Sequence, residues 1–276
     1  MTYRSILLHL DHRPHCVGRT RAAIRLATEL DCHLVGLAPT GVMGMALAMD
    51  VASVGQLAEL AWETMRDLAR EAAQTFEGAC RDAGLKSFES VFDESDTATS
   101  IVRHAHCSDL CVLSQADPRA PGHLAAQAVV EQVVLQCARP TLLIPHAGSY
   151  ETIGREALVA WDDSREAARA VADALPLLRR ARQVQVVCWR ENESSAGPAQ
   201  LEALHRWLMW QGVAAEVRTE VTDIDIADAL LSRAADAGSD LIVMGAYGHA
   251  RWTERVLGGA TRGLLAAMTV PVLMSH

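Results

Sequence analysis

Glycines near the end of the chain have the spacing expected of a phosphate-binding loop. Gly245 and Gly248 follow the apolar run 241–244, and Gly258 and Gly259 precede an apolar pattern of helical period. A glycine lets the backbone approach an anion closely and can adopt positive φ. The N-terminus of a helix offers unpaired N–H groups and the positive end of its dipole. A strand followed by glycines and then by the start of a helix is the order expected of a phosphate-binding site. We therefore predict such a site, the phosphate seat, at residues 245–259.

This pattern differs from two common phosphate-binding motifs. It contains no Gly-Lys-Ser/Thr, since Lys86 is the only lysine of the chain, and it is not a G-x-G-x-x-G turn. Instead, Gly-x2-Gly-x9-Gly between Asp240-Leu-Ile-Val-Met and Pro271-Val-Leu resembles the universal stress protein family. In that family the last glycine is usually followed by Ser or Thr, whose hydroxyl helps to hold phosphate. Here Gly259 stands in that place, and Thr261 offers either a replacement hydroxyl or an N-terminal cap.

The resemblance implies that the second half of the chain binds an adenine nucleotide, ATP, with Mg²⁺ as a candidate accompanying ion. Asp162, in Val159-Ala-Trp-Asp162-Asp-Ser164, matches a family turn whose acid contacts adenosine in nucleotide-binding members, although capping of the next helix is an equal alternative. Trp189 aligns with a position whose backbone meets adenine, so its ring would stack on the base or obstruct it. The candidate nucleotide-binding residues are Asp162, Trp189, Gly245, Gly248, Gly258, Gly259 and Thr261.

The chain contains two copies of one pattern. Ser108-Asp109-Leu-Cys-Val-Leu-Ser114 resembles Ser239-Asp240-Leu-Ile-Val-Met-Gly245, and 31 residues separate Asp109 from Pro140 as they separate Asp240 from Pro271. Strand patterns alternate with helical patterns in both copies, which predicts parallel α/β sheets with helices on both faces. We expect two Rossmann-like domains, residues 1–150 and 151–276, each with a five-stranded sheet. The family resemblance implies the adenine nucleotide alpha hydrolase-like variety of this fold.

The apolar patterns place the elements of both copies. The expected strands are 6–10, 33–38, 89–92, 110–113 and 141–144, then 157–160, 184–188, 215–218, 241–244 and 272–274. The expected helices are 20–30, 56–83, 97–106 and 129–137, then 165–178, 199–211, 226–237 and 260–268.

The first copy lacks the glycines of the second. At a constant offset of 131 residues, the four glycine positions become Ser114, Asp117, Gln127 and Ala128. Asp117 would repel phosphate. The first copy is therefore predicted to have the fold without the phosphate seat.

The last strand of each copy is a candidate contact between the copies. In the family, this strand pairs antiparallel across a two-fold axis, so the resemblance implies that Thr141–Ile144 pairs with Val272–Met274 inside one polypeptide. Such an intrachain pseudo-dimer would also cover two apolar edges. A homodimer of whole chains stays open as a further association.

Composition excludes some partners. The formal charge is −9 and no basic run occurs, which argues against nucleic acid as a partner. The sequence shows no signal-type segment and no apolar run of membrane-spanning length, so the expected location is the cytoplasm, with no membrane partner. Seven scattered cysteines favour reduced, mostly buried thiols over a disulfide framework.

Other chemistry is less well supported by the sequence. His12, His15 and His123 could meet beyond strand ends, but polar loop residues explain them more simply than metal ligands, and no metal site is predicted. No catalytic motif occurs, so no enzymatic activity is expected, with slow ATP hydrolysis left open. The favoured function is a stress-response regulator that binds ATP. The alternatives are a scaffold without nucleotide, an adenylating enzyme, and an apolar-ligand site in the Met-rich segment 40–54.

Overall fold

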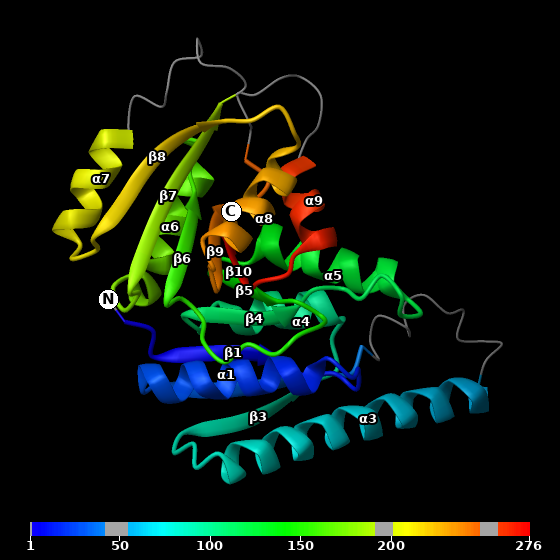
Figure 1. Ribbon diagram of the computed structural model, residues 1–276. Helices are drawn as coiled ribbons and strands as arrows, with labels where there is room; N and C mark the ends of the chain where they lie inside the picture. Colours follow the sequence, from blue (N-terminus) through cyan, green and yellow to red (C-terminus); the bar gives the residue numbers. More distant parts are fainter. Residues whose placement is uncertain (1, 42–54, 191–200, 249–258) are drawn as a thin grey trace.

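The described strands of the chain join in one sheet. The computed structural model describes residues 2–41, 55–190, 201–248 and 259–276. Within these ranges, a ten-stranded sheet has the order β3-β2-β1-β4-β5-β10-β9-β6-β7-β8 (Figure 1). The strands are β1 (Ser5–His9), β2 (His33–Pro39), β3 (Phe88–Asp93), β4 (Leu110–Ser114), β5 (Thr141–Ile144), β6 (Glu156–Ala160), β7 (Gln183–Arg190), β8 (Ala215–Val221), β9 (Leu241–Gly245) and β10 (Val272–Ser275).

The two halves of the sheet have the same topology. β3-β2-β1-β4-β5 in the first half corresponds to β8-β7-β6-β9-β10 in the second, and the pairs inside each half are parallel. Only β5 and β10 pair antiparallel, with Val272 opposite Leu143 and Met274 opposite Thr141. The predicted α/β class and the predicted pairing of the two last strands are both confirmed.

Helices cover both faces of the sheet. They are α1 (Cys16–Leu30), α3 (Gly55–Asp82), α4 (Thr97–Ala105), α5 (His123–Gln136), α6 (Arg165–Leu178), α7 (Leu201–Trp210), α8 (Ile226–Asp236) and α9 (Gly259–Ala267). α1 and α5 begin earlier than the apolar periodicity predicts. α5 follows Gly122, whose φ of 72° ends the preceding loop. The apolar residues Val17 and Leu124, in the first turns of α1 and α5, are exposed and so do not continue the buried apolar face of either helix.

Side chains from successive strand positions form two separate cores. Ile6 and Leu8 of β1 pack in the cluster that contains residues of α1, α3, α6 and α7, whereas Leu7 packs in the cluster under α4, α5, α8 and α9. This alternation follows from the two-residue period of a strand. Strands buried on both faces therefore read as continuous apolar runs, which explains why the sequence reveals them so clearly.

Hydrogen bonds join the two halves beside the β5–β10 pair. The hydroxyl of Tyr3 donates to the carbonyl of Asp173 at 2.6 Å. Arg169 Nη2 donates to the carbonyl of Ala138 at 2.7 Å. These contacts, with the fully buried side chains of β5 and β10, hold the halves in one structure.

The repeated aspartates have the same structural task in both halves. Asp109 Oδ2 accepts hydrogen bonds from the backbone N–H groups of Arg4 and Ser5, at 2.7 and 3.0 Å. Asp240 Oδ1 accepts them from Gly154 and Glu156, both at 2.9 Å. Each aspartate thus fixes the start of a neighbouring strand. This structural task explains why an aspartate occurs at the same position in both copies.

Three further expectations concern the chain as a whole. None of the seven cysteines, all in the described ranges, forms a disulfide bond, and five of them are buried, in agreement with the sequence analysis. Within the described ranges, none of the helices has the length and hydropathy to cross a membrane. Most of the Met-rich segment 40–54 lies outside the described residues.

Candidate functional site

The candidate site lies where the strand order of the second half reverses. β6 pairs with β7 on one side and with β9 on the other. Asp162 follows the end of β6, and Gly245 ends β9, so both are at the carboxyl edge of neighbouring parallel strands. Open α/β sheets bind ligands at this edge, at such a reversal. The topology therefore brings together two segments that are 83 residues apart in sequence.

Gly245 is required by the packing of α6 on β9. A Cβ atom at this position would lie 2.5 Å from the backbone nitrogen of Ala167 and 2.6 Å from the carbonyl carbon of Glu166. Both neighbours are backbone atoms in the first turn of α6. Backbone atoms of a helix cannot move away independently, as the end of a flexible side chain can. The glycine thus lets the helix N-terminus approach the strand end, a role that the sequence analysis did not anticipate.

Asp162 acts on the start of α6 through a serine. Asp162 Oδ1 accepts hydrogen bonds from the backbone N–H of Ser164 at 3.0 Å and from its hydroxyl at 2.5 Å. Ser164 Oγ in turn accepts the N–H of Ala167 at 3.1 Å and is the N-cap of α6. Asp163 between them has a φ of 62°. Of the alternatives considered, the capping role falls to Ser164, and Asp162 positions that cap.

Trp189 is part of the core. Its side chain is 7% exposed and packs in the cluster under α8 and α9. Strand β9, which lies beyond β6 in the sheet, contributes Met244 to the same cluster, and partly buried Tyr247 packs against it. In this conformation the indole of Trp189 is a packing group of the core.

The loop after β9 is tied to the start of α9. Tyr247 has a φ of 54°, and its backbone N–H donates to Thr261 Oγ1 at 3.2 Å. Thr261 is 4% exposed, so this hydroxyl is engaged in holding the loop. Gly259 is the first residue of α9. Gly258, also predicted for the phosphate seat, lies outside the described residues.

A carboxylate missed by the sequence analysis faces Gly248. Glu166 Oε2 lies 3.0 Å from where a Cβ of Gly248 would be, and Ser164 Oγ lies 3.5 Å from it. Burial by itself raises the pKa of Glu166, but its own backbone N–H, the guanidinium of Arg165 and the charge of His276 outweigh burial and lower the pKa. The side chain is therefore an anion beside the glycine loop. A glutamate in the first turn of a helix interacts favourably with the helix dipole. The position of Glu166 in the sequence does not indicate that its carboxylate lies beside Gly248.

The equivalent place in the first half is occupied by a buried arginine. Arg19 of α1 is 1% exposed, and its Nη1 donates to Ser114 Oγ at 2.8 Å. Its Nη2 lies 3.3 Å from Asp11 Oδ2. Ser114 is the counterpart of Gly245, and Gln127 and Ala128, the counterparts of the second glycine pair, lie inside α5. That this half lacks a phosphate site stays a prediction, and the arginine at this place was not foreseen.

His9 in the same cluster predicts sensitivity to acid. Burial, followed by the charge of Arg19, lowers the pKa of His9 from 6.5 to about 3. The unfolded chain therefore binds a proton below about pH 6.5 that the folded chain takes up only near pH 3. The free energy of unfolding should fall with decreasing pH in this window, by up to about 1.4 kcal/mol per pH unit.

Urea unfolding at about pH 6.5, 5.5 and 4.5 measures this effect. The wild-type protein should show a steeper loss of stability than His9→Gln, which has no imidazole to protonate. Equal slopes for the two proteins would show that His9 does not cause the acid sensitivity.

The histidines considered as metal ligands do not form a site. His12 is exposed, His15 is half-buried at the N-cap of α1, and His123 begins α5. Over the ranges that the structure describes, no three His, Cys, Asp or Glu side chains are grouped to hold a metal ion.

Solved structures show which proteins share this architecture. A universal stress protein from Archaeoglobus fulgidus DSM 4304 aligns with 98% of this chain and 95% of its own, with a TM-score of 0.72 and 17% identity. A functionally unknown protein from Pseudomonas aeruginosa PAO1 aligns with 99% of this chain and 92% of its own, with a TM-score of 0.58 and 16% identity. Among curated proteins, none matches this sequence. The fold of the whole chain is thus that of two-part α/β proteins.

The second half also carries a family signature in its sequence. Residues 155–276 match the model of the universal stress protein family. This range begins beside β6 and includes both the glycine loop and β10. The second half of the chain is thus similar in sequence to the universal stress protein family.

Proposed function

We propose that the protein is a stress-response regulator whose second half binds an adenine nucleotide, ATP, at the carboxyl edge of β6 and β9. The observation that carries this proposal is the convergence of three segments at the strand reversal. Gly248 lies beside Ser164 at the start of α6, and the same loop is bonded through Tyr247 to Thr261 at the start of α9. Two helix N-termini and a glycine loop then surround one seat, which suits an anion.

The proposal assigns the residues different tasks. Gly248 lets the loop backbone approach the nucleotide, and the first turn of α9, from Gly259, faces the phosphates. Asp162 has an exposed carboxylate whose Oδ1 is held by Ser164, so the group is positioned to accept hydrogen bonds from ribose. Gly245 and Trp189 support the seat through packing. We propose no catalytic residue.

Glu166 gives the proposed site a dependence on metal. Its carboxylate would repel a phosphate group placed beside Gly248, because like charges at a few ångströms in a partly desolvated site oppose each other strongly. A Mg²⁺ ion bound to the phosphates would offset this repulsion, since Mg²⁺ binds carboxylate and phosphate oxygens. We therefore expect wild-type protein to bind ATP with Mg²⁺ better than metal-free ATP, and Glu166→Gln to reduce that difference.

The decisive experiment measures ATP binding by calorimetry with Mg²⁺ present. Gly248→Glu should weaken binding at least about tenfold, because it adds a second carboxylate to the seat. Asp117→Glu, at the equivalent position of the first half, is the matched control and should leave the affinity unchanged. If Gly248→Glu and wild type bound ATP with equal affinity, the nucleotide would not be bound beside Gly248.

The alternative function is a protein-interaction module of the same fold that binds no nucleotide. Two observations favour it: the carboxylate of Glu166 beside Gly248 and the burial of Trp189 in the core. This alternative would be supported if neither wild type nor Glu166→Gln bound ATP, whether Mg²⁺ was present or not. We further propose that the two halves are separate domains, 1–150 and 151–276, since β5 ends at Ile144 and β6 begins at Glu156.

A further inference from the structure

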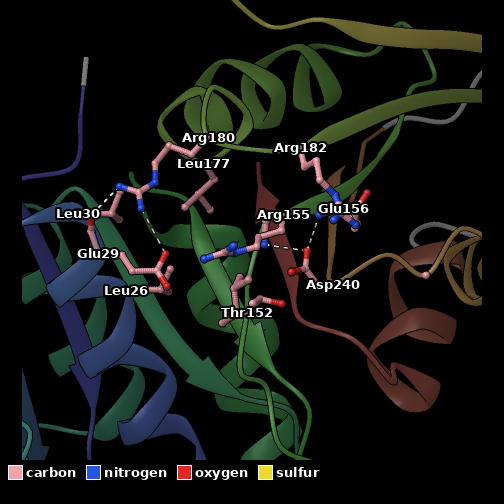
Figure 2. A pocket seen from close by; sticks show the side chains of 13 residues that line it. Leu26, Glu29, Leu30, Thr152, Arg155, Glu156, Leu177, Arg180, Arg182 and Asp240 are labelled. Atoms are coloured by element: carbon pink, nitrogen blue, oxygen red, sulfur yellow. Dashed lines mark hydrogen bonds and ion pairs between the residues drawn. The ribbon is translucent and has the colours of Figure 1, made fainter.

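A cavity of ≈ 570 Å³ lies between the two halves of the chain (Figure 2). Leu26 and Leu30 of α1 line it from the first half, and Leu177 of α6 lines it from the second. Asp240, also in the lining, directly precedes β9, whereas Gly245 ends that strand. The cavity is therefore at the opposite edge of the sheet from the glycine loop. Its volume is in the range of about 300–1,000 Å³ that is typical of small-molecule sites.

Most charges in the cavity are matched by partners. Arg180 connects the two halves, because its Nη2 lies 3.3 Å from Glu29 Oε2 and its Nη1 donates to the carbonyl of Glu29 at 2.5 Å. Arg182 Nε donates to Glu156 Oε1 at 2.6 Å. Asp240 Oδ1 accepts two backbone N–H groups at 2.9 Å. Among these groups, only the buried Oδ2 of Asp240 has no hydrogen-bond partner in the described part of the chain.

Arg155 is an exposed cation of the lining. Its guanidinium has no hydrogen bond or ion pair with any residue in the described part of the chain. Its backbone is fixed, since its carbonyl accepts the N–H groups of Arg182 at 2.7 Å and Gln183 at 3.2 Å. Figure 2 shows the side chain reaching across the cavity, away from Asp240 and toward the side formed by Leu26 and Glu29. An unmatched cation is thus presented to the cavity from a rigid base.

The surroundings of Arg155 define the chemistry of a ligand. Leu26 and Leu177 are each 3% exposed and supply apolar walls from both halves. A guanidinium pairs bidentately with a planar carboxylate. The carboxylates of Glu29 and Asp240 in the lining would repel a doubly charged phosphate more than a singly charged group. The part of the cavity around Arg155, away from Asp240, therefore suits a ligand with one negative charge and an apolar body.

We propose that this cavity binds a small organic monocarboxylate whose carboxylate pairs with Arg155 and whose apolar chain lies against Leu26, Leu30 and Leu177. The site is independent of the proposed nucleotide site and contacts both halves of the chain. A bound molecule would stabilise the folded chain by mass action.

Octanoate is the probe that tests this site, titrated by calorimetry into the full chain at constant ionic strength. Octanol, with the same chain and no charge, measures the apolar contribution, and octyl phosphate measures the effect of a second charge. Arg155→Gln should weaken octanoate binding at least about tenfold, because the charge-assisted pair is lost. Arg21→Gln changes an exposed arginine of α1 outside the cavity and should bind octanoate as wild type does.

The expected order of affinity for wild type is octanoate above both octanol and octyl phosphate. No saturable binding of octanoate, or equal binding by wild type and Arg155→Gln, would overturn the proposal. A higher affinity for octyl phosphate would overturn the monocarboxylate assignment. Since no nucleotide is present in these titrations, their outcome is separate from that of the ATP experiment.

Discussion

Gly245→Ala should lower the free energy of unfolding by about 3 kcal/mol, the upper part of the usual range for an overpacked core. The added methyl carbon would lie 2.5 Å from the nitrogen of Ala167 and 2.6 Å from the carbonyl carbon of Glu166. Strand β9 is fixed by β6 and β10 on its two sides. Relief therefore requires α6 to move off the sheet, which would separate Ala167, Ala170 and Ala174 from the core that they share with β6 and β9.

Urea unfolding of wild type and Gly245→Ala measures this loss, and the chain offers a matched control. Gly78 lies inside α3 and has nothing within 4 Å of the position of its Cβ. Gly78→Ala should therefore stabilise the protein by about 0.5–1 kcal/mol through helix propensity alone.

The same variant separates two roles of Gly245. If the residue were needed only for nucleotide binding, Gly245→Ala would unfold like wild type without ATP. A stability equal to that of wild type would therefore contradict the packing role. A loss of stability without nucleotide, in contrast, means that the first glycine of the motif is required by the fold itself.

Arg19→Met should cost about 3–5 kcal/mol, the range found when one partner of a buried ion pair is removed. The guanidinium is 1% exposed, donates to Ser114 Oγ at 2.8 Å and lies 3.3 Å from Asp11 Oδ2. Burial by itself raises the pKa of Asp11, and the charge of Arg19, with smaller contributions from other groups, lowers it to about 2. Without Arg19 the carboxylate keeps its burial and loses its main counter-charge.

Two comparisons make this prediction specific. Arg21→Met changes an exposed arginine of the same helix and should alter stability by no more than about 0.5 kcal/mol. The double variant Arg19→Met/Asp11→Asn should be more stable than Arg19→Met alone, because it leaves no unpaired buried charge. NMR titration should also show a higher pKa for Asp11 in Arg19→Met. A single variant as stable as wild type would contradict the assigned role.

Much of the fold is determined locally by the sequence. The runs 110–113 and 241–244 read as strands because they are buried on both faces and are apolar at every position. The repeated interval from Asp109 to Pro140 and from Asp240 to Pro271 reveals two copies of one unit. Antiparallel pairing of β5 with β10 followed from the family resemblance and is what the structure shows. The starts of α1 and α5 were placed too late because the apolar residues of their first turns, Val17 and Leu124, are exposed and do not belong to the buried periodic face.

The candidate site could be predicted only in part. Sequence spacing placed Asp162, Gly245 and Thr261 near one edge, since the carboxyl ends of parallel strands share that edge. It could not show that Gly245 touches α6, that Trp189 points into a core, or that Thr261 holds the loop. Each of these facts depends on the distance and angle between elements far apart in the chain.

The sequence by itself determined the strands, the repeat and the glycine motif, because these depend on residue type and on spacing along the chain. Only the tertiary structure placed Glu166 beside Gly248, Arg19 beside Asp11, and an unmatched Arg155 in a cavity between the halves. The physical reason is that burial and electrostatic interaction depend on distance in space. A residue's charge is written in the sequence, but whether that charge is matched is decided by the folded chain.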